Sequence, residues 1–229
     1  MPDSATSSET ANRQAAAAPS RAWQRMLSGR RLDLLNPSPV DVEIEDIAHG
    51  LSRVARWNGQ TKGDWAFSVA QHGVLVETIA RRLKPNLKPD WCLAVLLHDA
   101  PEYVVGDLIT PFKSAVGLDY KTLERRLMSA ILIRFGLPGE LPPSVHRLIK
   151  RADAVAAYLE ATQLAGFSET EARRTFGRPR HFDTVAGDLA LAPWAPQDAK
   201  ARYLARFAEL APGAAAAGNE AGMSSGCAT

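Results

Sequence analysis

The chain has 229 residues, of which 46% are hydrophobic and 23% charged, as is usual for a globular protein of one domain. Its formal net charge of +2 is too small to favour binding to nucleic acid or to an anionic membrane surface. The apolar run at its centre, Trp91 to Leu97, is far shorter than the ~20 residues of a membrane span. No secretory signal opens the sequence, and Cys92 and Cys227 are too few for a disulfide framework or a thiolate metal site. We therefore expect a cytoplasmic protein.

Both ends of the sequence have the composition of disordered tails. Residues 1–20 are rich in Ser, Ala and Thr, residues 213–229 are rich in Ala, Gly and Ser, and neither has a periodic apolar face. The sequence therefore predicts one folded domain over residues 21–212 between two disordered tails.

Apolar residues at helical spacing dominate the folded part. They predict helices over residues 44–54, 65–83, 90–100, 119–135, 144–164 and 197–210. Gly136 and Gly166 stand just past two of these ranges, where glycine commonly ends a helix. Residues 32–42 could form an extended segment, but no segment favours a sheet. The predicted fold class is all-α.

Three of the helical patterns contain a polar residue that is costly to bury. His72 lies in SVAQHGVLV, His98 and Asp99 end LAVLLHDAPE, and Asp153 lies in LIKRADAVAAYL. A buried carboxylate must be paired, hydrogen-bonded or bound to a metal. Adjacent helical residues point ~100° apart, so His98 and Asp99 can share one ion only near a helix end. Pro101 favours a bend there.

Together, these four residues supply two imidazoles and two carboxylates. Such a mixed set suits one divalent ion of Mn, Co, Fe, Ni or Zn, with open positions for water and an anionic ligand. His146 precedes Asp153 by seven residues, or ~10 Å along a helix, which is too far to share the same ion. A single histidine in an apolar stripe is more often an ordinary core residue, but the joint pattern favours a metal site.

The order His72, His98-Asp99, Asp153 resembles the H…HD…D signature of HD-domain metal-dependent phosphohydrolases. More closely, the segments SRVARW, SVAQH, LLHDAPEYVVGDLITPFK and IKRADAVAAYLE are similar to the 5′-deoxynucleotidase branch of that superfamily. The resemblance covers roughly residues 47–166. It implies a single HD-domain helical bundle, one bound divalent cation and hydrolysis of a phosphate ester, usually in a nucleotide. The metal ligands that it implies are His72, His98, Asp99 and Asp153.

The resemblance also implies roles for the residues around the ion. Asp99, as a ligand, and Glu102, as an acid or base for water or the leaving group, are the expected catalytic residues. Arg56 is expected to bind phosphate, Trp57 to pack on the nucleoside and Asp107 to contact the sugar hydroxyl. Without the resemblance, Glu102 is typical of an exposed helix end and Arg56-Trp57 of a solvated arginine beside a core aromatic. Asp107 is then typical of a turn. The expected substrate-binding residues are Arg56, Trp57, Asp107, Thr110 and Lys113.

The chain departs from the family pattern at two places. Gln71 stands where the family commonly has a glutamate before the first histidine, so the usual partner of His72 is absent from that position. The upstream stretch SGRRLDLLNPSPVDVEIEDIAHGLS lies outside the deoxynucleotidase pattern, and it resembles bacterial HD phosphohydrolases without settled substrates. This segment could cap the pocket and alter substrate selection.

The function that these patterns favour is release of phosphate from deoxynucleoside 5′-monophosphates. One alternative is a deoxynucleoside triphosphohydrolase or another phosphoanhydride hydrolase at the same metal site. An alternative of another class is a non-catalytic module that binds metal or nucleotide. The expected partner is a small-molecule nucleotide, without nucleic acid or membrane, and the resemblance implies a homodimer.

Overall fold

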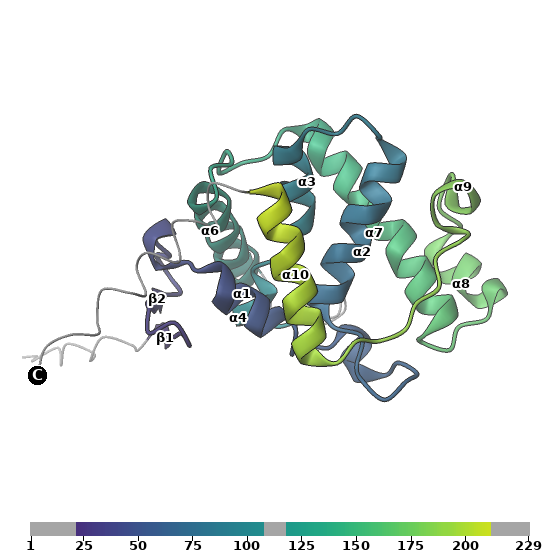
Figure 1. Ribbon diagram of the computed structural model, residues 1–229, viewed down its shortest axis with the longest axis horizontal. Helices are drawn as coiled ribbons and strands as arrows, with labels where there is room; N and C mark the ends of the chain where they lie inside the picture. Colours follow the sequence, from purple (N-terminus) through teal and green to yellow (C-terminus); the bar gives the residue numbers. More distant parts are fainter. Residues whose placement is uncertain (1–21, 108–117, 212–229) are drawn as a thin grey trace, which may run out of the picture.

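The computed structural model describes residues 22–107 and 118–211, so both predicted tails lie outside the described residues. The described chain is mainly a bundle of α-helices, and its one sheet has two short strands (Figure 1). The predicted all-α class is therefore confirmed.

The elements follow one another in a simple order. The helices are α1 (Ile44–Leu51), α2 (Val69–Leu83), α3 (Pro89–Leu96), α4 (Glu102–Val105), α6 (Leu118–Arg134), α7 (Pro143–Gln163), α8 (Glu169–Phe176), α9 (Phe182–Ala186) and α10 (Pro196–Leu210). The strands are β1 (Trp23–Arg25) and β2 (Arg31–Asp33), and the 3-10 turns are η1 (Pro39–Asp41) and η2 (Arg56–Gly59). The six predicted helices correspond to α1, α2, α3, α6, α7 and α10, whereas α4, α8, α9 and the hairpin were not predicted.

Helix α2 lies at the centre of the bundle, packed against α7 on one side and against α3 and α10 on the other (Figure 1). Its buried residues include Val69, Val76 and Ile79, which belong to one continuous apolar core. At Gly73 an added Cβ would lie 3.1 Å from the carbonyl oxygen of Leu96 and 3.3 Å from the ring of Tyr203. The missing side chain thus lets α2 approach α3 and α10 closely, which brings the neighbouring His72 beside the end of α3.

The end of α3 corrects one predicted boundary. The pattern extends to residue 100, but the α-helix ends at Leu96 and tight turns follow. The backbone N–H groups of His98, Ala100 and Glu102 donate to carbonyl groups only three residues earlier, at 3.2, 2.9 and 3.0 Å. Pro101 leads into the short helix α4, in keeping with the bend expected there. His98 and Asp99 therefore lie in a turn between two helices.

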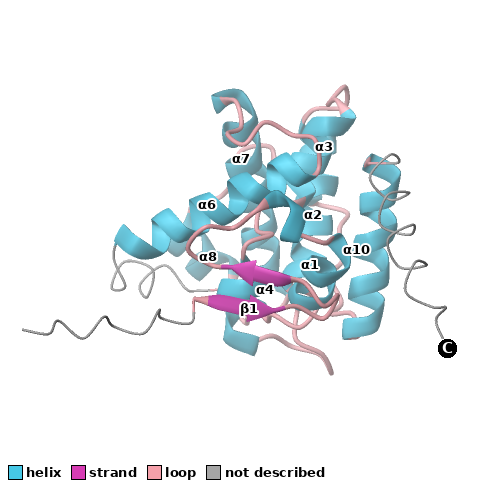
Figure 2. Ribbon diagram, turned by 90° about the vertical axis from the view of Figure 1, so that its left-hand side faces the viewer, coloured by secondary structure: helices cyan, strands magenta, loops and turns pink. Residues whose placement is uncertain are grey.

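The N-terminal hairpin is attached to the bundle by the buried Leu32 and by polar contacts to α1 rather than by a large sheet. In β1 and β2, which lie on the side facing the viewer in Figure 2, Gln24 pairs with Leu32. In the turn of the hairpin, Ser28 donates its backbone N–H and its hydroxyl to the buried Asp46 of α1, at 2.9 and 2.5 Å. The hairpin is thus fastened to the start of α1.

The segment after the hairpin contacts α6. Arg134 of α6 donates to the carbonyl oxygen of Val42 at 2.9 Å and to Glu43 at 3.1 Å. Arg126, also on α6, donates to the carbonyl oxygen of Leu35 at 3.0 Å. Residues 34–43 therefore fix the position of α6 in the bundle.

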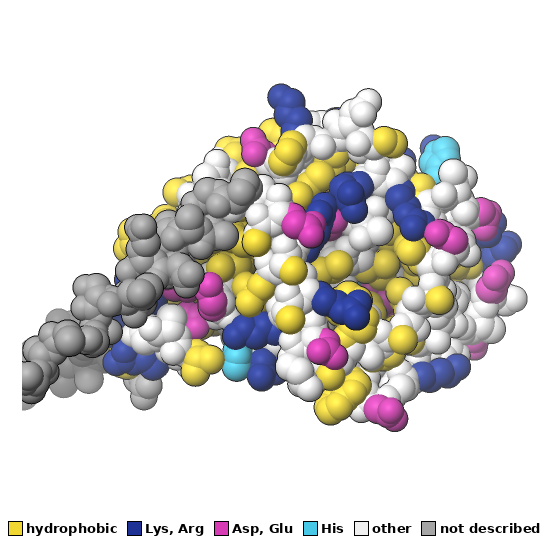
Figure 3. Space-filling view, viewed as in Figure 1, with side chains coloured by type: hydrophobic (Ala, Val, Ile, Leu, Met, Phe, Trp, Pro, Cys, Tyr) yellow, Lys and Arg dark blue, Asp and Glu magenta, His cyan; other side chains and the backbone are white. Residues whose placement is uncertain are grey.

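The face formed by α2 and α10 carries charges of both signs side by side (Figure 3). The buried Glu77 lies 2.6 Å from Arg206 and 3.0 Å from Arg81, so its charge is compensated. In the part of the chain that the structure describes, no helix is both long and apolar enough to cross a membrane.

Candidate metal centre

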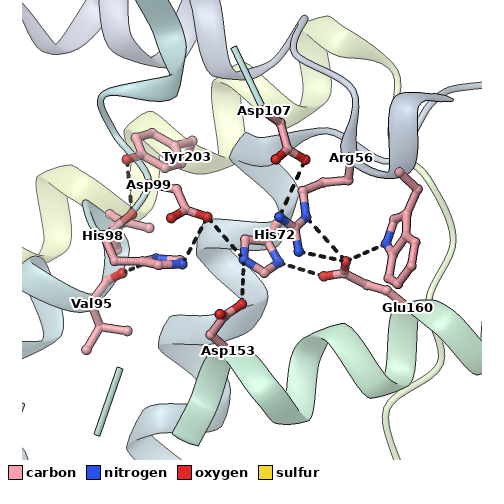
Figure 4. A network of polar contacts seen from close by, with 11 residues as sticks. Arg56, His72, Val95, His98, Asp99, Asp107, Asp153, Glu160 and Tyr203 are labelled. Atoms are coloured by element: carbon pink, nitrogen blue, oxygen red, sulfur yellow. Dashed lines mark hydrogen bonds and ion pairs between the residues drawn. The ribbon is translucent and has the colours of Figure 1, made fainter. Parts of the chain in front are cut away.

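Three segments that are distant in the sequence bring imidazoles and carboxylates together (Figure 4). His72 comes from α2, His98 and Asp99 from the turn after α3, and Asp153 from the middle of α7. The Nε2 atom of His72 lies 3.4 Å from Oδ2 of Asp99 and 3.3 Å from Oδ1 of Asp153. The Nε2 atom of His98 lies 3.2 Å from the same oxygen of Asp99. The four predicted ligand residues therefore meet at one place.

Hydrogen bonds on the far side of each ring decide which imidazole nitrogen faces this place. Nδ1 of His98 lies 2.9 Å from the carbonyl oxygen of Val95, which can only accept, so Nδ1 carries the proton. Nδ1 of His72 lies 2.6 Å from a carboxylate oxygen of Glu160 and donates to it likewise. Both Nε2 atoms are buried and form no hydrogen bond within the described residues. In the neutral rings they present lone pairs toward carboxylate oxygens, an arrangement that a cation between them stabilises.

The separations fit one divalent ion. Ligand atoms of His72, His98 and Asp153 all lie within 4.8 Å of one another. Ligands placed about 2.1 Å from a common ion lie roughly 3 to 4 Å apart, so small movements suffice to bind it. The His72 side chain is fully buried, whereas the side chains of Asp99 and Asp153 are 26% and 44% exposed. The site is therefore closed on the imidazole side and open on the carboxylate side, where water or a ligand can enter.

Without an ion, these groups shift one another's pKa values strongly. Burial and the nearby Arg56 lower the pKa of His72, but Glu160, Asp153 and Asp99 outweigh them, so this pKa is raised well above its ordinary value. Burial raises the pKa of Asp99, but His98 and His72 bring it well below its usual range. The pKa of Asp153 is also lowered, since the two histidines outweigh the effect of burial. In the metal-free protein, a proton on His72 thus takes the place of a cation.

Glu160 of α7 is the residue of this site that sequence reasoning missed. Its fully buried carboxylate accepts hydrogen bonds from Nδ1 of His72 at 2.6 Å, from Nε1 of Trp57 at 2.8 Å and from Arg56 at 3.3 Å. Burial raises its pKa, but His72 and Arg56 outweigh this and lower it, so Glu160 is ionised at neutral pH. The residue follows Asp153 by seven positions, two turns along the same face of α7, in an otherwise apolar stretch. The seven-residue spacing from Asp153 was therefore the signal by which the sequence could have indicated Glu160.

Arg56 lies on the Nδ1 side of His72 and contacts carboxylates there (Figure 4), and Trp57 contacts the same Glu160. Besides Glu160, Arg56 lies 3.5 Å from Oδ2 of Asp107. Trp57 has a φ of 57°, in the left-handed region that bulky residues rarely adopt, and its ring packs 5.9 Å from Phe167. Arg56 and Trp57 thus contact Glu160, which contacts the predicted ligand His72, and Asp107 contacts Arg56. Their predicted roles in substrate binding stay predictions, while Thr110 and Lys113 lie outside the described residues.

Gln71 stands where the family pattern has a glutamate that is the usual partner of the first histidine, but its side chain contacts the loop before α10. Its amide nitrogen donates to the carbonyl oxygen of Ala192 at 2.8 Å, and its amide oxygen accepts from the backbone of Trp194 at 2.9 Å. Gln71 therefore fastens the loop before α10 to α2, and Glu160 takes the position beside Nδ1 of His72.

A cavity of about 730 Å³ lies between α6, α7 and the turn that carries His98 and Asp99. Asp153 also lines it, and so does His146, which is too far along α7 to share the ion directly. Arg56, Trp57 and residues 28–45 are not among the described residues that line it. Among the residues described, the segment expected to cap the pocket thus contacts α6 rather than the cavity. The other predicted catalytic residue, Glu102, is buried at the start of α4.

No family model matches the chain. A 5′-deoxynucleotidase from Cronobacter sakazakii is 27% identical over 121 residues, an alignment that covers 42% of this chain and 60% of that protein. An uncharacterized protein from Rhodobacter capsulatus is 58% identical over 186 residues, which cover 81% of this chain and 94% of that protein. This chain therefore belongs to the same family as the uncharacterized Rhodobacter capsulatus protein.

Proposed function

We propose that the protein is a metal-dependent phosphohydrolase of nucleotides, which releases phosphate from deoxynucleoside 5′-monophosphates. The observation that carries the proposal is the pair of buried Nε2 lone pairs beside two partly exposed carboxylates, at the wall of an open cavity. The distant similarity to a 5′-deoxynucleotidase supports the choice of substrate class. The ligands are His72, His98, Asp99 and Asp153.

An ion bound there would lower the pKa of a water molecule and neutralise charge on phosphate oxygens. The protein's own part is to position the reactants. Glu160 fixes the tautomer of His72, and the carbonyl group of Val95 does the same for His98. Glu102 would accept a proton from the attacking water or donate one to the departing alkoxide. Arg56 would bind the equatorial oxygens of the phosphate, after moving from the carboxylates that it contacts in this structure.

A phosphate-release screen tests the proposal. The purified protein, reconstituted with Mn²⁺, Co²⁺, Fe²⁺, Ni²⁺ or Zn²⁺, is incubated with ribo- and deoxynucleoside mono- and triphosphates. Inorganic phosphate should appear with a deoxynucleoside 5′-monophosphate and at least one of the metals. If the folded, metal-loaded protein releases phosphate from none of these nucleotides, the proposal is contradicted.

Substitution of Glu102 separates an enzyme from a non-catalytic binding module. Glu102→Gln keeps the size of the side chain but removes the acid or base, so kcat should fall about 100-fold or more. Metal content, measured on the same preparation, should be unchanged because Glu102 is not a ligand. The exposed Glu45 of α1 provides a matched control, and Glu45→Gln should keep the wild-type rate. A Glu102→Gln variant as fast as the wild type would favour the binding module.

A further inference from the structure

The cavity beside the metal centre is lined by an excess of positive charge. Apart from the predicted ligands, its lining includes four Lys or Arg residues against two glutamates, an excess of two positive charges. Three of the cations, Lys121, Arg125 and Lys150, are exposed and form no ion pair with any residue that the structure describes. Other arginines are paired with carboxylates, as Arg206 is with Glu77 and Arg134 with Glu43.

These three side chains lie on the same two helices that form the cavity walls. Lys121 and Arg125 are four residues apart on α6, on the face that continues through the cavity-lining Leu132. On α7, Lys150 precedes the ligand Asp153 by three residues, so it lies on the same face about 4.5 Å along the helix axis. The unpaired cations therefore begin one helical turn from the metal centre.

The charges nearer the ion are already balanced. A divalent ion would be compensated by Asp99 and Asp153, and the scissile phosphate would bind at the open side of that ion. Arg56 contacts Glu160 and Asp107, so its charge is compensated as well. Repulsion among Lys121, Arg125 and Lys150, which exceeds what Glu124 and Glu140 of the same lining offset, favours binding of an anion between them.

We propose that the preferred nucleotide carries a second phosphate group, which Lys150 binds together with Lys121 and Arg125 in the cavity of the metal centre. This inference rests on the proposed function, because it assumes that the first phosphate is hydrolysed at the ion. The second group has two possible sources of the same chemistry: the 3′-phosphate of a nucleoside 3′,5′-bisphosphate, or the next phosphate of a nucleoside triphosphate. A cavity of about 730 Å³ is within the range of small-molecule sites.

The test compares substrates and variants. The kcat/KM values for a deoxynucleoside 5′-monophosphate, its 3′,5′-bisphosphate and its 5′-triphosphate are measured for the wild type, Lys150→Gln and Arg125→Gln. Arg151→Gln is the matched control, since Arg151 is the next residue of α7, is exposed and unpaired among the described residues, and lines a different cavity. The wild type should prefer one of the doubly phosphorylated substrates. Lys150→Gln and Arg125→Gln should each lower that preference about tenfold, while Arg151→Gln leaves it unchanged.

The outcomes separate this inference from the proposed function. Preference for the bisphosphate assigns the second group to the 3′ position, and preference for the triphosphate assigns it to a phosphoanhydride. Hydrolysis of the monophosphate, with a substrate preference that neither substitution changes, overturns the inference and leaves the proposed function standing. Release of phosphate from none of the substrates contradicts the proposed function. In that case, the Kd values for the bisphosphate and the triphosphate are measured by calorimetry for the wild type and for Lys150→Gln. If both proteins bind the two compounds with the same Kd, the inference is overturned.

Discussion

At the scale of single residues, Glu160 connects the metal centre to the residues behind it. One carboxylate accepts hydrogen bonds from an imidazole, a guanidinium and an indole, so His72, Arg56 and Trp57 share one partner. A buried carboxylate is costly unless its oxygens are satisfied, and here two cationic groups and one neutral donor satisfy them. The orientation of His72 toward the ion therefore depends on a residue that would not contact the ion.

Glu160→Gln should weaken metal binding without removing a ligand. The amide of glutamine keeps the volume but loses the charge, and its NH₂ group competes with the donors around it. We expect the Kd for Mn²⁺ or Co²⁺ to rise about 10- to 100-fold, measured by isothermal titration calorimetry. The free energy of unfolding should fall by roughly 3 kcal/mol, because Arg56 is left without its buried partner.

The control for this prediction is the residue beside His72. Gln71→Ala removes the contacts to Ala192 and Trp194 but leaves the hydrogen bond between His72 and Glu160 intact. It should lower the melting temperature with little change in the Kd for metal. Wild-type metal affinity in the Glu160→Gln protein would show that His72 is oriented by other contacts.

At the scale of elements, the contact between α1 and α4 positions Glu102. An added Cβ at Gly50 of α1 would lie 2.8 Å from the Cβ of Tyr103 and 3.0 Å from its backbone oxygen. Tyr103 is the residue after Glu102, so α1 approaches the backbone of α4 closely at that point. The position of Glu102 therefore depends on the absence of a side chain at Gly50.

Gly50→Ala should destabilise the protein although alanine favours helices. Overpacking against backbone typically costs 1–3 kcal/mol, which outweighs the gain of up to about 1 kcal/mol in helix propensity. We expect the free energy of unfolding, measured by urea denaturation, to fall by about 1 kcal/mol. The rate of phosphate release should fall as well, because α4 moves with Glu102. A variant that is more stable than the wild type would contradict the close packing of α1 and α4.

The elements also show how far the sequence alone could lead. The long helices α2, α6, α7 and α10 were predictable because their apolar periodicity extends over several turns. The start of α2 was predicted at residue 65, whereas the helix begins after Ser68, whose hydroxyl accepts from the N–H of Gln71 at 3.2 Å. Helices α4 and α9 and the three-residue strands are too short for a period to be recognised, whereas α8, as long as α1 and α3, buries one residue, Ala172, and therefore shows no apolar face. The patterns also indicated the four predicted ligands. The spacing of Glu160 from Asp153 places it on the same face of α7, but its partner, Nδ1 of His72, became known only from the contact between α7 and α2.

At the scale of the whole molecule, the metal centre is a cross-link between parts that are distant along the chain. Its residues come from α2, the turn after α3 and α7, and α2 and α7 form the main packing contact of the bundle. An ion that binds only the folded state stabilises it by an amount that grows with the logarithm of the free metal concentration. Addition of Mn²⁺ or Co²⁺ should therefore raise the melting temperature, and chelation should lower it.

The pH dependence of this stabilisation has a defined sign. In metal-free protein the raised pKa of His72 contributes stability that is fully present below its ordinary value of 6.5 and is lost as the pH rises through the raised value. The lowered pKa values of Asp99 and Asp153 contribute stability that is present above 3.8 and is lost as the pH falls. The contribution of these three groups to the stability of chelator-treated protein should therefore be largest between about pH 4 and 6.5.

Metal and protons compete for the same imidazole, so the stabilising effect of metal should increase with pH. Thermal unfolding is followed from pH 5 to pH 9 in chelator and in excess Mn²⁺, and the difference between the two melting temperatures is plotted against pH. This difference should widen as the pH rises toward the raised pKa of His72, because the ion then displaces a proton from a smaller fraction of the folded molecules. In Asp153→Asn the difference should be smaller at every pH, since one ligand charge is lost. A difference that narrows toward alkaline pH would mean that the ion and the proton do not share the Nε2 atom of His72, and the candidate metal centre would have to be placed elsewhere.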